Sequence, residues 1–290
     1  MTEPLAIRLV SLNLWDLPVP LPRFDRHARR RLLLERLPRL DADLLLFQES
    51  FRPRFRRALA EACGFESHPD CAGGRWVLGL PMDRTGGLLT LSRWPIVSQH
   101  HQPARRFRSF RLDERIGRKG CLWTRVRTPA GDVLVGNVHL YAGNNPVDAR
   151  VRAVQARDLL MRGALSAERP AILAGDFNWD LDFERSERGP RGHEVMLEAG
   201  FHEVAGGRSA GIVTMDPRHN RYARYTPWHR PPRRLTHVFY RGAGLTAGPD
   251  PPALCLNDPP VSDHFGLRAT LTLSGEWGAG RVPLPTPHSP

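Results

Sequence analysis

The chain has 290 residues, of which 41% are hydrophobic and 8% aromatic. This composition provides a large buried core in one or two domains, and it excludes collagen-like, disulfide-scaffold and wholly disordered proteins. The 42 basic residues outnumber the 30 acidic ones, which gives a net charge of +12, and Lys119 is the only lysine. The arginine excess has two interpretations. Arginine's planar guanidinium matches phosphate oxygens, and a positively charged chain attracts polyanions or acidic membrane surfaces. A GC-rich genome produces the same excess of arginine over lysine without any function.

Cysteine spacing and hydropathy exclude further classes. Cys63, Cys71, Cys121 and Cys255 have no C-x-x-C spacing and are too sparse for a zinc site or a disulfide framework, so we expect them to be free or incidentally paired. No apolar run approaches the roughly 20 residues of a membrane span, and no signal-peptide pattern opens the chain. We therefore expect a cytoplasmic protein without a transmembrane segment, with a monomer as the default.

The first 50 residues predict a strand, a helix and a second strand. Residues 7–13 alternate and are rich in strand-forming residues, which predicts a strand that ends at Asn13. Residues 29–40 have leucines at helical spacing and predict an amphipathic helix with a basic exposed face. Residues 44–47 form a continuous apolar run, typical of a strand covered on both faces, and Gln48 and Glu49 follow it.

The middle of the chain predicts mainly short strands and turns. The turn at 128–132 separates two strands of a hairpin, and the second of these ends at His139. The predicted elements are a helix at 54–63, a Gly-rich loop at 71–87, strands at 88–91 and 96–97 around a turn at 92–95, and hairpin strands at 122–127 and 133–141.

The last part of the chain predicts a long surface helix at 147–165 and a buried strand at 171–175 that runs into Asp176 and Asn178. An irregular basic segment, two strands and a tail follow. They cover residues 206–234, 235–240, 264–273 and 274–290, and the tail has so many prolines that we expect it to be disordered or extended. We expect residues 1–273 to form a single catalytic domain.

Polar residues of catalytic type lie at or near the ends of these predicted strands. Open α/β sheets place their ligand sites at such ends. We therefore expect these residues to meet in a single cleft that is assembled from most of the chain. Carboxylates and an Asn carbonyl are hard oxygen ligands suited to Mg²⁺ or Mn²⁺. The residues are Asn13, Glu49, His139, Asp176, Asn178, Asp263 and His264.

Five motifs in order resemble the endonuclease/exonuclease/phosphatase superfamily. They are Ser-Leu-Asn-Leu-Trp at 11–15, Phe-Gln-Glu-Ser at 47–50, Asn-Val-His-Leu at 137–140, Gly-Asp-Phe-Asn at 175–178 and Ser-Asp-His-Phe-Gly-Leu at 262–267. Each residue alone has an ordinary structural explanation, such as a cap or a turn, but five ordered coincidences do not. The segments 86–96, 118–120 and 262–267 look most like the neutral sphingomyelinase branch.

The resemblance implies an α/β fold with four layers, in which two mixed β-sheets pack face to face between helices, with one metal-dependent site at one edge. It implies Glu49 as the main ligand of Mg²⁺ or Mn²⁺, with Asn13 and Asp263 close to the same ion or reaching it through water.

The same resemblance implies the catalytic roles. Asp176 would orient and deprotonate the attacking water, and Asn178 would hold that water or a phosphate oxygen. His139 and His264 would donate to the phosphoryl oxygens as negative charge develops during in-line attack.

One position departs from the family pattern. Thr236 stands where relatives carry an aspartate that hydrogen-bonds the last catalytic histidine and fixes its tautomer and charge. Threonine accepts a hydrogen bond but carries no charge. The expected result is reduced activity or replacement by another carboxylate.

Two segments, 105–119 and 208–234, interleave basic and aromatic residues. Such segments suit stacking on bases with phosphate contacts, an anionic membrane surface, or merely solvated loops. We therefore expect a metal-dependent phosphodiesterase or nuclease-type hydrolase that acts on a phospholipid headgroup or a nucleic acid. The alternative is a catalytically impaired protein on the same scaffold that binds nucleic acid or anionic membranes.

Overall fold

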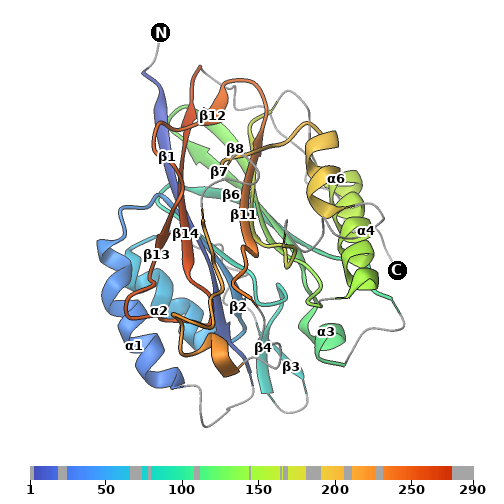
Figure 1. Ribbon diagram of the computed structural model, residues 1–290. Coiled ribbons are helices and arrows are strands. Elements are labelled where there is room, and N and C mark those ends of the chain that lie inside the picture. The colour runs from blue at the N-terminus through green and yellow to red at the C-terminus, as the bar shows by residue number, and fades with distance from the viewer. Residues whose placement is uncertain are drawn as a thin grey trace.

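The structure is a computed structural model, in which twelve strands form two large sheets (Figure 1). It describes residues 3–18, 25–65, 74–77, 80–107, 112–143, 145–163, 165, 169–180, 191–205, 211–225 and 231–275.

The first sheet has the strand order β12-β14-β1-β2-β5, and β13 also pairs with β14. β1 and β2 are parallel and the other pairs are antiparallel, so the sheet is mixed. Its strands are β1 Leu5–Asp16, β2 Leu44–Ser50, β5 Leu89–Ser92, β12 Leu245–Ala247, β13 Ala253–Cys255 and β14 Gly266–Leu273.

The second sheet has the order β10-β11-β9-β8-β7-β6 and is also mixed, because β8 and β9 are parallel. A separate hairpin pairs β3 with β4. The strands are β3 Gly74–Val77, β4 Leu80–Asp83, β6 Ile96–Pro103, β7 Gly120–Thr128, β8 Gly131–His139, β9 Ala171–Asp176, β10 His202–Glu203 and β11 Thr236–Arg241.

The two sheets pack face to face and the helices cover their outer faces, which confirms the four-layer sandwich (Figure 1). Side chains such as Leu46, Val135 and Ala174 fill the space between the sheets. Two further apolar clusters lie under the helices, one beneath α1 and α2 and the other beneath α4 and α6. The helices are α1 Arg26–Arg36, α2 Pro53–Cys63, α3 Leu112–Gly117, α4 Pro146–Arg162 and α6 Gly192–Glu198, with 3₁₀ turns η2 Leu37–Arg39 and η4 Ala223–Tyr225.

Local sequence sets the ends of the helices. α2 begins with a proline in its first turn and ends at Gly64, whose φ of 63° is the left-handed conformation that glycine adopts without strain. α4 begins with a reciprocal capping box between Asn145 and Asp148. α4 ends at Arg162, whereas the sequence predicted a helix as far as residue 165. Small residues such as Ala153 form its buried face, and Val147 is therefore 60% exposed.

The predicted strands and the predicted hairpin are present, with different lengths. The turn at 92–95 does not join two strands of one sheet but carries the chain from β5 in the first sheet to β6 in the second. The expected loop at 71–87 is wrong in part, because β3 and β4 form a hairpin within it. Three very short strands, β10, β12 and β13, and the helices α3 and α6 were not predicted.

The remaining expectations concern thiols, termini and membranes. Cys63, Cys121 and Cys255 are free thiols, whereas Cys71 and almost all of the Pro-rich tail lie outside the described residues. The described parts of 206–234 are irregular apart from η4 and a bridge between Met215 and Arg233. No helix in the described part of the chain is long and apolar enough to span a membrane.

Candidate active site

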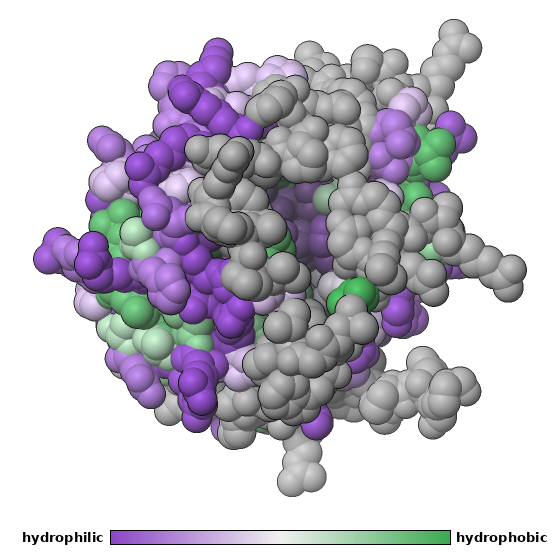
Figure 2. Space-filling model, turned by 90° about the horizontal axis from the view of Figure 1, so that it is seen from below, coloured by the Kyte–Doolittle hydropathy of each residue, from purple (hydrophilic) through white to green (hydrophobic). Residues whose placement is uncertain are grey.

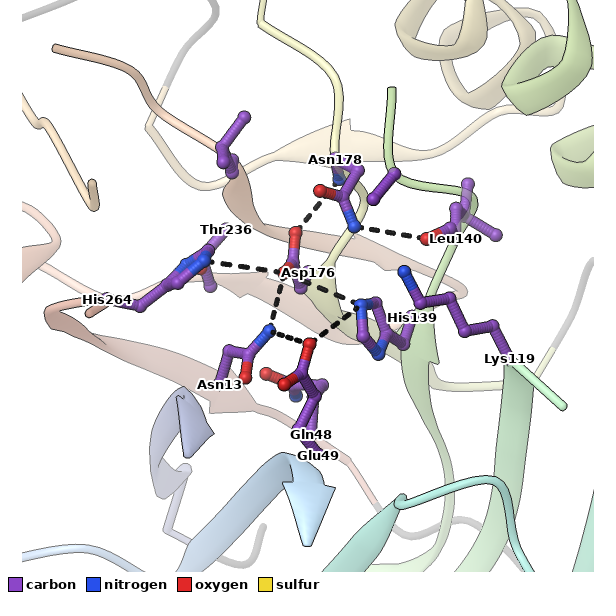
Figure 3. Close-up of polar contacts among 12 residues, drawn as sticks. Asn13, Gln48, Glu49, Lys119, His139, Leu140, Asp176, Asn178, Thr236 and His264 are labelled. Carbon is purple, nitrogen blue, oxygen red and sulfur yellow. Dashed lines mark hydrogen bonds and ion pairs between the residues drawn. The ribbon is translucent and has the colours of Figure 1, made fainter. Parts of the chain in front are cut away.

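The ends of four parallel strands meet at one edge of the sandwich. β1 and β2 carry Asn13 and Glu49 in the first sheet, while His139 and Asp176 end β8 and β9 as direct neighbours in the second sheet. His264 reaches the same place from the segment before β14 (Figure 3). Figure 2 looks onto this edge, where hydrophilic residues show at the floor of a hollow.

Asn13 joins the carboxylates of the two sheets. Its Nδ2 donates to Glu49 Oε1 at 3.2 Å and to Asp176 Oδ2 at 2.9 Å (Figure 3). Its Oδ1 accepts from the backbone N–H of Trp15 at 3.0 Å. The structure therefore gives Asn13 the task of holding the two carboxylates together, with its amide oxygen turned to the backbone.

Asp176 is buried at the centre of the site. Its Oδ1 accepts from the backbone N–H of Asn178 at 3.0 Å, and its Oδ2 lies 3.7 Å from His139 Nε2 and 3.8 Å from His264 Nε2. The side-chain amide of Asn178 donates to the carbonyl of Leu140 at 3.0 Å. One carboxylate oxygen thus faces two imidazoles at distances too long for direct hydrogen bonds but within reach of a shared ligand atom.

Glu49 presents a carboxylate oxygen without a partner. Its Oε2 is buried and has no hydrogen bond among the described residues, while Oε1 accepts from Asn13. Burial raises the pKa of Glu49 to about 7, although the charge of Lys119 opposes this shift. The backbone of Glu49 has a φ of 54°, in the left-handed region.

Asp263 lies beside this group and is 4% exposed. Burial raises its pKa, while the charges of His264 and Arg29 oppose the shift, and the nearby charge of Asp176 adds to it. The hydroxyl of Ser262 donates to the carbonyl of Asn13 at 2.6 Å and lies 3.1 Å from Asp263 Oδ1. Asp263 is therefore tied to the strand that carries Asn13.

The two histidines of the site are both buried. Burial lowers the pKa of His139 well below its usual range, so the ring is neutral. His264 Nδ1 is buried and has no hydrogen-bond partner among the described residues, and the same is true of Thr236 Oγ1. Thr236 pairs across the sheet with Asp176 and shares its face with Val238, between the sheets. The described residues thus give neither histidine a partner at Nδ1, since His139 Nδ1 is buried without a hydrogen bond as well.

Two groups in or beside the site were not assigned from the sequence. Lys119 Nζ donates to Glu114 Oε1 at 2.8 Å, and both side chains are nearly buried. Burial alone would lower the pKa of Lys119, but the charges of Glu114 and Glu49 raise it, so the amine stays protonated beside the carboxylates (Figure 3). The signal that could have identified Lys119 from the sequence is that it is the only lysine of the chain.

A buried amide pair connects the sheets directly behind the site. Gln48 Nε2 donates to Asn137 Oδ1 at 2.8 Å, and Asn137 Nδ2 donates to the carbonyls of Phe47 and Leu89 at 3.0 Å. Gln48 precedes Glu49, and Asn137 lies two residues before His139 on the same face of β8. This pair therefore sets the separation of the two halves of the site.

Other sequence candidates lie elsewhere or are buried. His237 points to the opposite face from Thr236, where its Nδ1 donates to Glu203 at 2.7 Å. Tyr222 of the segment 208–234 is 3% exposed, with Arg29 and Arg221 against its ring, so it is not available for stacking on bases. Trp228 lies outside the described residues.

The donor set suits a hard divalent cation. Among the described residues, no three His, Cys, Asp or Glu side chains are grouped so that they could hold a metal on their own. Mg²⁺ does not need such a cage, because it typically keeps several waters and takes one or two carboxylates together with substrate phosphates. The unpartnered Glu49 Oε2 and the neighbouring Asp263 fit that requirement.

Comparison with known proteins agrees with this geometry. The model of the endonuclease/exonuclease/phosphatase family matches residues 10–264. A comparison with curated protein sequences gives no significant match. Sphingomyelinase C from Streptomyces griseocarneus is 18% identical with a TM-score of 0.64, over 93% of this chain and 99% of that chain.

Two further solved structures have the same fold. A mutant of beta toxin from Staphylococcus aureus with bound magnesium ions is 19% identical with a TM-score of 0.63, over 93% of this chain and 100% of that chain. TDP2 from D. rerio, complexed with a single-strand DNA product, is 19% identical with a TM-score of 0.63, over 92% of this chain and 98% of that chain. At these identities the likeness establishes the fold.

Proposed function

We propose that this chain, which belongs to the endonuclease/exonuclease/phosphatase family, is a Mg²⁺- or Mn²⁺-dependent hydrolase that cleaves a phosphodiester bond by in-line attack of water. The observation that carries the proposal is the convergence of Glu49, Asp176 and two imidazoles on one point at the sheet edge. A carboxylate to accept a proton, donors for a phosphoryl group and a vacant carboxylate oxygen are the groups that this reaction needs.

Asp176 is the residue that takes the proton from the attacking water. Hydrogen bonds from Asn178 N–H and Asn13 Nδ2 hold its carboxylate in one orientation, which favours a fixed water position. The proton is transferred to the oxygen of Asp176 that faces the imidazoles.

The donors that surround this point stabilise the developing negative charge. His139 is neutral, so it donates through a single ring N–H, and His264 faces the same oxygen from the other side. Lys119 stays protonated and adds a positive charge nearby. Preorganised donors of this kind supply a large share of the rate enhancement of phosphoryl and acyl transfer enzymes.

Glu49 and Asp263 would hold the divalent cation, with Asn13 fixing the position of Glu49. The cation would supply Lewis-acid stabilisation of charge on the phosphoryl group. A bound cation also offsets the cost of keeping the Glu49 carboxylate ionised at a site where burial raises its pKa.

The substrate is proposed as a phospholipid headgroup or a nucleic acid. The local sequence motifs and the fold shared with sphingomyelinase C favour the lipid. The net charge of +12 and the fold shared with a DNA-bound TDP2 favour the nucleic acid.

A second candidate function rests on one observation. Among the described residues no carboxylate accepts a hydrogen bond from His264 Nδ1, and Thr236 Oγ1 has no hydrogen-bond partner either. This favours a protein that binds nucleic acid or anionic membranes and turns over slowly.

The first experiment measures hydrolysis of bis-p-nitrophenyl phosphate with Mg²⁺, Mn²⁺ or a chelator, with Asp176→Asn as the inactive control. Metal-dependent turnover that the Asp176→Asn variant loses supports the hydrolase. Absence of turnover on this ester, on sphingomyelin vesicles and on labelled DNA and RNA contradicts it and favours the binding protein.

The second experiment separates the substrates by salt dependence, with DNA binding measured on Asp176→Asn to prevent cleavage and sphingomyelin turnover measured on the wild type. Binding of a polynucleotide releases counterions, so its affinity falls steeply with salt. A zwitterionic headgroup has no comparable counterion release. Undetectable DNA binding at low salt contradicts the nucleic-acid substrate, and turnover of sphingomyelin that salt leaves unchanged supports the lipid.

A further inference from the structure

The backbone that carries Glu49 has an unusual conformation. Glu49 has a φ of 54° and Trp15, on the neighbouring strand, a φ of 48°, and the register of β1 and β2 shifts between Asn13 and Asp16. Residues other than glycine persist in the left-handed region only where the surrounding structure holds them there. Contacts around Glu49 must therefore fix this turn.

Three hydrogen bonds hold the two residues that follow Glu49. Ser50 N–H donates to the carbonyl of Gly87 at 2.8 Å, and the carbonyl of Ser50 accepts from Arg56 Nη1 at 2.9 Å. The carbonyl of Phe51 accepts from the backbone N–H of Asp83 at 3.0 Å. All three partners belong to α2 or to the segment 83–88.

Arg56 and Asp83 form the centre of this arrangement. Arg56 is 2% exposed and Asp83 1%, and Arg56 Nη1 lies 3.3 Å from Asp83 Oδ1. Both carboxylate oxygens of Asp83 accept from Gly87 N–H at 3.0 Å, and Arg56 Nη2 donates to the carbonyl of Leu88 at 2.7 Å. Thr85 Oγ1 connects the two, 3.0 Å from Arg56 Nη2 and 2.8 Å from Asp83 Oδ1.

The segment 83–88 lies in direct contact with the turn at Glu49. A Cβ added to Gly87 would lie 3.1 Å from Glu49 Cα and 2.9 Å from the ring of Phe51. Gly87 also has a φ of 78°. Any displacement of this segment is therefore transmitted to Glu49 without an intervening side chain.

We propose that Arg56 and Asp83 are positioning residues that hold Glu49 in its left-handed conformation and so aim its carboxylate into the site. The inference rests on the proposed function in taking Glu49 as the metal ligand. A buried ion pair is by itself a weak source of stability, because well-packed apolar residues replace such pairs without loss in many proteins. Here the guanidinium also spans Ser50, Thr85 and Leu88, which an apolar side chain cannot do.

The test compares Arg56→Lys with a matched control. Lysine keeps the charge opposite Asp83 but cannot span the carbonyls of Ser50 and Leu88 at once. The control is Arg8→Lys, since Arg8 forms a similar fork with Asp43 at the opposite ends of β1 and β2. Mn²⁺ affinity is measured by calorimetry, and crystal structures of both variants give the φ of Glu49.

Arg56→Lys is expected to lower Mn²⁺ affinity by about 10- to 100-fold, the range typical of residues that orient metal ligands, while Arg8→Lys leaves it unchanged. Equal Mn²⁺ affinity of Arg56→Lys and the wild type overturns the inference. Wild-type protein that binds no Mn²⁺ contradicts the metal dependence in the proposed function. In that case the crystal structures decide, because an unmoved Glu49 in Arg56→Lys overturns the inference and a displaced Glu49 supports it.

A milder variant covers the case in which Arg56→Lys does not fold. Thr85→Val keeps the shape of the side chain and the ion pair but removes the hydroxyl that connects Arg56 to Asp83. The expected loss of Mn²⁺ affinity is several-fold, with a smaller displacement of Glu49. Unchanged affinity together with an unmoved Glu49 overturns the inference.

Discussion

Restoring a carboxylate next to His264 tests the chemistry of the site most directly. Thr236 is fully buried and lies across the sheet from Asp176, which is itself 3.8 Å from His264 Nε2. In Thr236→Asp the carboxylate oxygens extend one bond beyond the position of the threonine hydroxyl. We expect them to accept the N–H of His264 Nδ1, which has no hydrogen-bond partner among the described residues.

The magnitude follows from two opposing effects. A hydrogen bond to a charged group contributes about 1.5–3 kcal/mol, and only the part that strengthens as the ring donates in the transition state increases the rate. If about half of it does so, the gain is about 0.8–1.5 kcal/mol, or about 4- to 13-fold in kcat. Burying a second carboxylate opposite Asp176 costs about 1–3 kcal/mol of stability, so the melting temperature should fall while kcat rises.

The assay is metal-dependent hydrolysis of bis-p-nitrophenyl phosphate, with kcat and KM determined separately, next to thermal unfolding of each variant. Thr236→Asn is the control, because it offers a similar acceptor without charge and should recover only the orientation of the ring. Unchanged or lower kcat in Thr236→Asp, or equal kcat in the Asp and Asn variants, would refute the argument that the missing charge limits the rate.

Three other outcomes are expected. Glu49→Gln should abolish Mn²⁺ binding in calorimetry, because the amide removes the charge at the unpartnered Oε2; undiminished affinity would remove Glu49 from the metal site. Lys119→Met should lower kcat about 100-fold with a smaller change in KM, as measured by steady-state kinetics, and a change in KM alone would show that the amine binds substrate without stabilising the transition state. Glu203→Gln should lower the free energy of unfolding by about 3 kcal/mol at pH 7, since hydrogen bonds from His193 and His237 hold the pKa of Glu203 below its usual range despite its burial. The difference from wild type should narrow as the pH falls below about 4.3, where the unfolded carboxyl is protonated, and urea titrations that give equal stabilities at pH 7 would contradict this role.

The sequence predicted those parts of the fold whose local signal is strong. Buried strands such as β2 and β9 are continuous apolar runs with a carboxylate within two residues of their ends, and both the strand and the position of Glu49 or Asp176 could be anticipated. The helix α2 is bounded by a proline and a glycine, and its predicted end was correct. By contrast β10, β12 and β13 have two or three residues each, too few for a periodic pattern.

The parts of the site that escaped prediction depend on contacts between distant residues. Nothing in the sequence around Arg56 distinguishes it from the exposed arginines of α2, because its burial is created by Asp83 and the carbonyls of Ser50 and Leu88. Tyr222 belongs to a segment for which stacking on bases was one of three interpretations, but Arg29 lies against its ring in the interior. The hydrogen bonds by which the Asn13 amide joins the two sheets could not be anticipated either, because Glu49 and Asp176 are distant in the sequence.

Lys119 is the only lysine of the chain, so it carries the only primary amine among the side chains. Reagents that acylate side-chain primary amines have a single target in this sequence, and that target is 13% exposed and hydrogen-bonded to Glu114. Acylation requires both access of the reagent and loss of the proton that the surrounding carboxylates retain. The rate of acylation therefore reports how often the site opens to solvent, without any introduced label.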